Sequence, residues 1–229
     1  MKINRVMITT LMAFLPLFSM AQEGYPAVAP TATYINDQGV ETVSTDLIEG
    51  QAPLTVSFLA NPSNIEDHNP SYEWHFRLES EATDMAVRYE ENTEYTFTTA
   101  GVNLVTLIFK PDVDKEALDS VVFRVTVSMS TLVFPNAFSP NNGDDLNDVF
   151  KAKEYRSIVE FHAYIFNRWG QKLYDWTDPD GGWDGTYNGK DVKEGVYFLL
   201  CKAKGADGRE YNIKKDVNLL RGYTETTSY

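Results

Sequence analysis

The sequence predicts an all-β protein made of two consecutive antiparallel β-sandwiches, preceded by a cleaved secretory signal. Short stretches in which apolar and polar residues alternate recur from residue 55 to residue 220, with turn residues between them. Beyond the first 21 residues, no long window places apolar residues at helical spacing. The length of 229 residues suits a short signal and two domains of about 100 residues each.

The first segment, residues 1–21, is typical of a signal peptide. Lys2 and Arg5 give a basic start, residues 6–18 form an apolar run, and Ser19 and Ala21 are the small residues that a signal peptidase reads. The apolar run is too short for a membrane span, which needs roughly 20 residues. We therefore expect a chain that leaves the cytoplasm and loses this segment.

Five stretches of the first domain, residues 27–128, alternate in the manner of half-buried strands. They are residues 55–59, 72–76, 95–97, 104–109 and 121–127. Residues 79–89 are compatible with a strand pair, a loop or a short helical turn. Short strands separated by turn residues predict a β-sandwich.

Three motifs of this domain resemble a PKD-type immunoglobulin-like domain. They are residues 50–58 (GQAPLTVSF), 72–76 (YEWHF) and 95–101 (YTFTTAG). The chain departs from the family where His75 replaces an Asp and residues 77–79 replace a glycine-rich turn. The resemblance implies an immunoglobulin-like sandwich, and Trp74 suits a core position on its central strand.

The second domain, residues 131–223, follows a short linker at residues 128–130. Strands are predicted at residues 160–166, 171–174, 196–203 and 213–220. In the first of these, Phe161, Ala163 and Ile165 share one face. We expect a second sandwich of short antiparallel strands, and no sequence repeat relates the two halves.

Four motifs of the second domain carry a more specific resemblance. They are residues 134–141 (FPNAFSPN), 166–170 (FNRWG), 182–189 (GWDGTYNG) and 195–198 (GVYF). Together they resemble the gliding motility-associated C-terminal domain of Bacteroidetes, the type B sorting signal of the type IX secretion system. The resemblance implies export by the type IX translocon and recognition by a PorP/SprF-like outer-membrane barrel. It places the protein at the cell surface or outside the cell, associated with the outer membrane.

The charge is concentrated in the first domain. Residues 27–128 hold 17 Asp and Glu against 5 Lys and Arg, a net of −12, whereas residues 131–223 hold 14 against 13. An acidic surface repels phosphate backbones, so the sequence disfavours nucleic acid as a partner. Solubility outside the cell accounts for the acidity.

One loop of the second domain could bind calcium. Asp144, Asp145, Asn147 and Asp148 supply closely spaced oxygen atoms, and Ca²⁺ prefers such ligands. The alternative is a loop whose Asx side chains cap their own backbone amides without a metal. No Glu follows at the spacing of an EF-hand, which favours the metal-free loop. We expect no other cofactor.

Two tryptophan–glycine motifs have two interpretations. Trp169 and Trp183, the latter followed by Asp184, could stack on a sugar ring. Large aromatic residues of a sandwich without disulfides are more often part of its core, however, and glycines beside them mark turns. The sequence therefore favours a structural role for both motifs.

No catalytic pattern stands out, so we expect a protein without enzymatic activity. His68, His75 and His162 lack metal-ligand spacing, and Cys201 sits in an apolar stretch typical of a buried residue. The favoured hypothesis is an accessory of the export or gliding machinery, docked on the barrel. The alternative is a surface adhesin or a glycan- or protein-binding module carried by the PKD-like domain.

Overall fold

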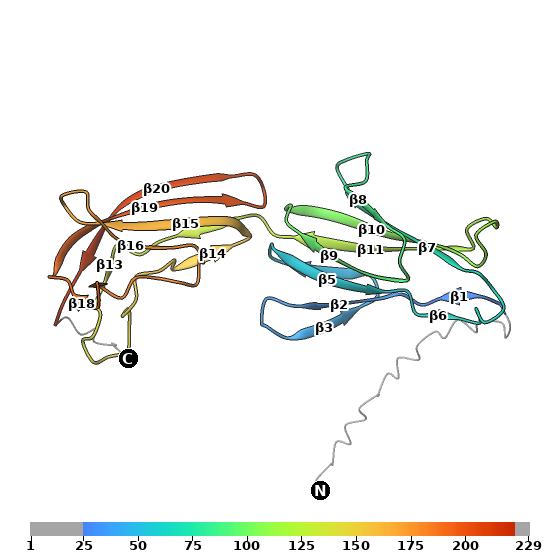
Figure 1. The fold of residues 1–229 in the computed structure, drawn as a ribbon, viewed down its shortest axis with the longest axis horizontal. Helices are drawn as coiled ribbons and strands as arrows, with labels where there is room; N and C mark the ends of the chain where they lie inside the picture. Colours follow the sequence, from blue (N-terminus) through green and yellow to red (C-terminus); the bar gives the residue numbers. More distant parts are fainter. Residues whose placement is uncertain (1–24, 223–229) are drawn as a thin grey trace, which may run out of the picture.

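A computed structural model describes residues 25–222 and shows an all-β molecule, which confirms the predicted fold class. Two sandwich domains follow each other along the long axis (Figure 1). No helix within the described residues is long and apolar enough to cross a membrane. The predicted signal peptide, residues 1–21, lies outside the described residues.

The first domain consists of two facing sheets. The four-stranded sheet has the order β3-β2-β5-β9, and the five-stranded sheet has the order β4-β11-β10-β7-β8. A short pair, β1 with β6, lies at the end away from the second domain (Figure 1). The bounds are β1 Ala27–Val28, β2 Thr31–Ile35, β3 Glu41–Ser44, β4 Leu47–Gly50, β5 Leu54–Leu59, β6 Pro62–Ser63, β7 Ser71–Leu78, β8 Ala86–Arg88, β9 Asn92–Phe97, β10 Gly101–Lys110 and β11 Asp119–Val127. All five predicted strands are present, and a loop leads from β7 into β8.

Aromatic rings fill the space between these two sheets. Phe58 on β5 is fully buried, and its ring lies 5.3 Å from Phe123 and 5.6 Å from Trp74, centroid to centroid. Phe76 lies 5.8 Å from Phe58 on the other side. The Trp74 indole is fully buried, as predicted, and its Nε1 donates to the carbonyl of Glu90 at 3.1 Å. The buried residues that alternate along β5 and β7 therefore belong to one shared core.

The second domain is built on one five-stranded sheet of order β13-β20-β19-β15-β16. Two small ribbons, β12 with β14 and β17 with β18, complete it. Leu132 on β12 belongs to the same buried cluster as Leu199 on β19, so the ribbon and the sheet share a core. The bounds are β12 Thr131–Val133, β13 Ala137–Phe138, β14 Glu154–Arg156, β15 Ile158–Phe166, β16 Lys172–Trp176, β17 Thr186–Tyr187, β18 Lys190–Asp191, β19 Gly195–Gly205 and β20 Glu210–Leu219.

Trp183 is the centre of the second core. Its side chain is fully buried, 5.3 Å from the ring of Phe138 and 5.0 Å from the ring of Tyr197. Its backbone exchanges hydrogen bonds with Phe150, and its Nε1 donates to the carbonyl of Thr186 at 2.8 Å. The structure thus confirms a structural role for this tryptophan.

The two five-stranded sheets have the same connectivity, although the sequence shows no repeat. In each, the first strand pairs in parallel with the last strand of its domain: β4 with β11, and β13 with β20. In each, a hairpin of the last two strands then pairs with an earlier hairpin: β10–β11 with β7–β8, and β19–β20 with β15–β16. The two domains therefore share a strand topology. Two sequences can form the same topology when their buried positions match, even if the residues at those positions differ.

The domains meet at a hydrogen-bonded junction around Ser157. This residue is buried and has a φ of 47°, a conformation rare for residues other than glycine. Its hydroxyl accepts from the amide of Ala52 at 3.1 Å and shares a hydrogen bond with the hydroxyl of Ser128 at 2.8 Å. Its carbonyl accepts from the amide of Ala206 at 2.9 Å. One serine thus ties the first domain, the linker and the second domain together.

The turn between β19 and β20 completes the junction. Ala206 belongs to the buried cluster of the first domain, and its carbonyl accepts from the amide of Ala100 at 2.9 Å. Asp207 accepts from the hydroxyl of Ser130 at 2.7 Å and from its amide at 3.2 Å. Burial opposes the charge of Asp207, but these hydrogen bonds and one from Arg209 outweigh it, so the pKa of Asp207 is lowered.

Replacing Trp183 tests the aromatic core. Trp183→Ala should destabilise the protein by about 3–5 kcal/mol, because removal of the indole leaves a cavity that the neighbouring side chains cannot fill. The melting temperature, followed by circular dichroism, should fall by roughly 10 °C or more. Trp169→Ala, at an exposed position, is the control and should melt within a few degrees of the natural protein. An unchanged melt of Trp183→Ala would contradict the packing described here.

Replacing Asp207 tests the junction. Asp207→Asn should cost about 1–2 kcal/mol at pH 7, because a neutral amide oxygen accepts weaker hydrogen bonds than a carboxylate. Folding lowers the pKa of Asp207, so its contribution is complete above the ordinary value of about 3.9 and is lost as the pH falls through the folded pKa.

Urea unfolding of the natural protein and of Asp207→Asn at pH 7, 5 and 3 measures this contribution. The gap in unfolding free energy should be equal at pH 7 and 5 and narrower at pH 3. Asp216→Asn, on the exposed face of β20, is the matched control. A gap that does not change between pH 5 and pH 3 would show that the carboxylate charge contributes nothing.

Candidate functional site

The aspartate-rich loop is held by its own side chains. The Asp148 carboxylate accepts from the amide of Asn141 at 2.8 Å, and the Asp144 carboxylate accepts from the amide of Leu146 at 2.9 Å. Asp145 has a φ of 56°, which the sharp turns of this loop require. Two of the four predicted calcium ligands therefore cap backbone amides, as Asx turns do.

Asn147 has the same left-handed backbone, with a φ of 55°, and its carbonyl accepts from the amide of Ser139 at 2.9 Å. Within residues 25–222, no three His, Cys, Asp or Glu side chains are grouped so as to hold a metal ion. The metal-free loop stays the prediction, with calcium binding as its alternative.

The other tryptophan motif has a different role from the one expected. Trp169 is 79% exposed, so the expectation that this large aromatic residue belongs to the core is wrong, whereas the turn predicted beside Gly170 is confirmed. The physical reason is its position: β15 ends at Phe166 and β16 begins at Lys172, which places Trp169 at the apex of a hairpin. The residues between the two strands, 167–171, are called the hairpin tip below.

Four backbone amides of the hairpin tip donate hydrogen bonds within the tip. The amide of Asn167 donates to the carbonyl of Gln171, and the amide of Gly170 donates to the carbonyl of Asn167, both at 3.0 Å. The Oδ1 atom of Asn167 accepts from the amides of Trp169 and Gln171 at 3.0 and 3.1 Å. Gly170 has a φ of 78°, which a residue with a side chain adopts only with strain. The tip therefore presents Trp169 on a defined backbone.

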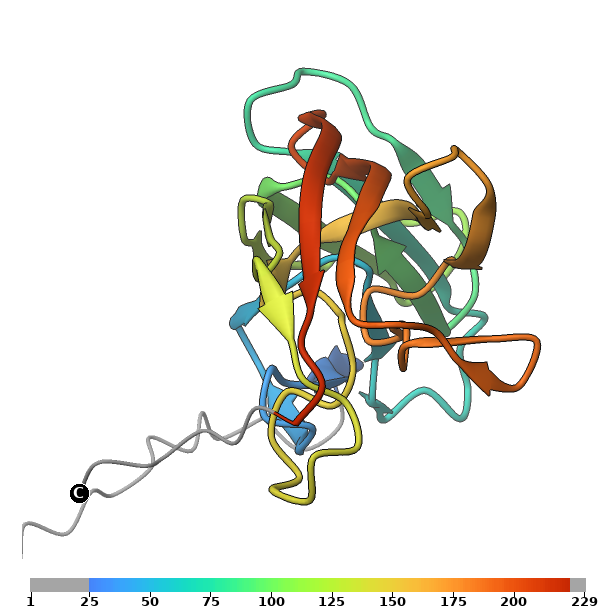
Figure 2. The ribbon, with the colours of Figure 1, turned by 90° about the vertical axis from the view of Figure 1, so that its left-hand side faces the viewer.

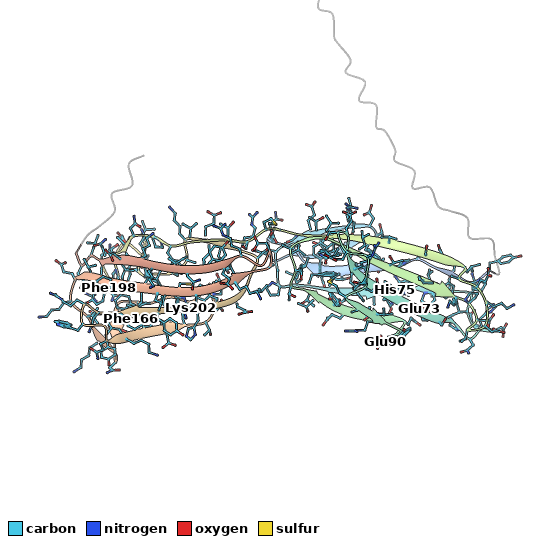
Figure 3. All side chains as sticks on the ribbon, turned by 90° about the horizontal axis from the view of Figure 1, so that it is seen from above. Glu73, His75, Glu90, Phe166, Phe198 and Lys202 are labelled. Atoms are coloured by element: carbon cyan, nitrogen blue, oxygen red, sulfur yellow. The ribbon has the colours of Figure 1, made fainter. Side chains whose placement is uncertain are left out.

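Two hollows flank the hairpin tip. One, of about 260 Å³, lies between the tip and the segment that leads into β19, and Tyr187, Val192 and Tyr197 help to line it. The other, of about 880 Å³, lies over the outer face of the sheet, where Phe166 and Phe198 pair across β15 and β19. Figure 3 shows both phenylalanines at the end of the second domain away from the first, and Figure 2 looks onto this end.

A charged cluster continues along the outer face of the sheet. His162 lies 3.0 Å from Asp175 through Nε2 and 2.8 Å from the hydroxyl of Tyr164 through Nδ1. Lys172 donates to Asp175 at 2.7 Å, and this bond together with His162 lowers the pKa of Asp175. The same hydrogen bond raises the pKa of Lys172. These groups satisfy one another on an exposed surface, where such pairs contribute little.

A similar charged cluster lies on the outer face of the first domain (Figure 3). His75 lies 2.8 Å from Asp84 and 3.6 Å from Glu73, and Lys110 donates to Glu73 at 3.0 Å. The hydrogen bond from Lys110 lowers the pKa of Glu73. His68 pairs with Asp112 at 3.1 Å elsewhere in the domain. His68, His75 and His162 thus lie apart from one another, and each lies beside one or two carboxylates.

Cys201 lies in the second core, as predicted. Its thiol is fully buried, and burial raises its pKa to about 12. A thiol with such a pKa is protonated at neutral pH and is a poor nucleophile.

Comparison with protein families identifies the second domain. Residues 132–216 match the CHU_C type IX secretion signal domain. This part of the chain, from β12 into β20, is therefore a sorting signal handled by the type IX secretion system, and it implies export out of the cell. No curated protein matches the chain.

Comparison with solved structures finds similarity at low identity and low TM-score. Bacteroides ovatus SGBP-B of a mixed-linkage glucan utilization locus, in complex with a mixed-linkage heptasaccharide, is 14% identical, with a TM-score of 0.29 over 76% of this chain and 42% of its own. Dimeric latent PorU from Porphyromonas gingivalis is 15% identical, with a TM-score of 0.26 over 86% of this chain and 20% of its own. A tetra-tandem repeat of a large adhesion protein is 12% identical, with a TM-score of 0.27 over 85% and 67%. The chain spans less than half the length of the first two.

Calorimetry tests the aspartate-rich loop. Titration of the protein with CaCl₂ should show no binding tighter than millimolar, because the carboxylates of Asp144 and Asp148 already accept backbone hydrogen bonds. Asp216→Ala, an exposed residue of β20 outside the loop, is the matched control for Asp144→Ala. A micromolar isotherm that Asp144→Ala abolishes would overturn this expectation and establish the loop as a calcium site.

Proposed function

We propose that this is a non-enzymatic cell-surface protein that the type IX system exports and that docks on a PorP/SprF-like outer-membrane barrel. In this role it is an accessory of the export or gliding machinery. The single observation that carries the proposal is the match of residues 132–216 to a type IX secretion signal domain. Residues 27–128 are then the exported part that the signal delivers.

The structure of residues 27–128 and their attachment to the signal domain support the role of an accessory protein tethered at the membrane. These residues form an acidic sandwich that lies directly before the signal domain in the sequence. It is also joined to the signal domain through buried contacts of Ser157 and Ala206, so the signal is not an appendage on a flexible linker. A protein with this construction suits a component that stays beside its docking partner.

Several features support a role without catalysis. His68, His75 and His162 each lie within hydrogen-bonding distance of a carboxylate at the surface. No described nucleophile hydrogen-bonds to these histidines except the hydroxyl of Tyr164, and the thiol of Cys201 is buried. Nucleophilic catalysis requires a nucleophile and a base within hydrogen-bonding reach in an accessible site.

A binding role for the PKD-like domain is the second candidate. The loop on either side of β8 exposes Met85 at 42% and Tyr89 at 71%, beside the acidic residues Glu90 and Glu91. Exposed aromatic residues on a loop are common in recognition sites. This loop is the part of the first domain that best suits a glycan or protein ligand in a surface adhesin.

A crosslinked pull-down from intact cells of the native species tests docking. Full-length tagged protein should recover a PorP/SprF-like barrel, and a truncation ending at Ser130 should not. Because the truncation also removes Ala206 from the first core, a second control is needed. Residues 131–229 placed behind an unrelated folded reporter with a signal peptide should recover the same barrel.

Export and docking are separate readouts of this experiment. Full-length protein found free in the medium, with no envelope partner recovered by it or by the reporter fusion, would refute docking. The search would then move to soluble ligands of the PKD-like domain.

A further inference from the structure

We propose that the hairpin tip, residues 167–171 with Trp169 at its apex, is the contact through which the protein machinery of type IX export binds this signal domain. The inference rests on the proposed function, because it names the part of the signal that its partner reads. It follows from the exposure of Trp169, from the rigid turn that presents it and from the surface around it.

Burial explains four large aromatic residues of the motifs that mark this domain. Phe134, Phe138, Trp183 and Tyr197 all lie in the second core. The other aromatic residues of these motifs are at most 40% exposed, whereas Trp169 is 79% exposed. An exposed indole adds nothing to the core and leaves a large apolar surface in water, which is unfavourable. Its place in a secretion signal is therefore accounted for by a contact made with another molecule.

The turn holds the indole ready for such a contact. Asn167 and Gly170 fix the backbone of the tip through the hydrogen bonds described above, and the guanidinium of Arg168 lies 5.0 Å from the centre of the Trp169 ring. A side chain presented on an ordered turn loses little conformational entropy on binding. Tryptophan and arginine are also the residues enriched among those that dominate protein interfaces.

The surroundings define the chemistry of the partner. The hollow of about 260 Å³ beside the tip is lined by apolar atoms of Leu173 and Val192 and by Lys193 and Glu194. The exposed ring of Phe198, on the other side, extends the apolar surface. A protein with an apolar slot for the indole and carboxylates facing Arg168 and Lys193 fits this surface. A sugar would use the ring alone and is the competing occupant.

The tip also lies where a large partner can approach. β15 begins beside Ser157 at the junction and ends at Phe166, so the tip stands roughly 30 Å from the first domain along this strand. Figure 1 shows this end of the second domain free of the first. The opposite end, at the turn around Ala206, is covered by the first domain.

Export of full-length variants from native cells tests the inference. Trp169→Ala should lower the exported fraction by about tenfold or more, the effect expected for losing a dominant interface tryptophan. Trp169→Phe should retain part of the export. Tyr89→Ala removes a comparably exposed aromatic residue from the first domain and should be exported normally. Purified Trp169→Ala should melt within about 2 °C of the natural protein, which separates recognition from folding.

Full-length variants also distinguish this inference from the proposed function. If Trp169→Ala is exported and recovers the barrel as well as the natural protein does, the inference fails and the proposed function stands. If the natural full-length protein is not exported, both fail. Normal export of Trp169→Ala with lost binding to a cell-surface polysaccharide would also overturn the inference and assign Trp169 to glycan binding.

Discussion

Burial of aromatic rings is the interaction on which both domains depend. The chain has one cysteine, and Cys201 is reduced and buried, so no disulfide restrains either sandwich. Phe58 in the first domain and Trp183 in the second each contact rings from several other segments. Such pairs add geometric preference to the area they bury. Because the cores supply the stability, the surfaces are free to differ, and one domain carries almost all of the net negative charge.

The junction extends this principle to the arrangement of the domains. Ser157, Ala206 and Asp207 belong to the second domain, yet all three bind the first domain or the linker. Both five-stranded sheets lie in the same layer of the molecule (Figure 1). The chain is therefore a single elongated body in which the signal domain has a fixed orientation relative to the part it exports. A partner bound at the hairpin tip would hold the acidic domain at a set distance.

The sequence predicts the parts of this structure that depend on local alternation. The long strands around Trp74 and Cys201 are found where the pattern places them, because both faces of these strands have distinct environments. The strands β2, β3 and β4 are not predicted because each is short and mixes buried apolar residues such as Ile48 with exposed ones such as Val43 and Leu47. Most tryptophans of such sandwiches are buried in the core, and Trp169 is an exception. Its position between two predicted strands, before a glycine, was the available signal that it sits at a turn. The junction hydrogen bonds of Ser157 with Ser128 and with Ala52 join residues 29 and 105 positions apart, and no local pattern predicts them.

The position of Ala206 has a consequence for the order of folding. The amide of Ala100 is hydrogen-bonded to Ala206, so the first domain is closed by a residue that lies far beyond its own last strand. A chain that is synthesised or translocated from its N-terminus delivers β1 to β11 well before this residue arrives. The first domain can form its aromatic core at that stage, but its end stays open to water. Completion of the exported part thus waits for nearly the whole signal domain, and the two reach their final state together.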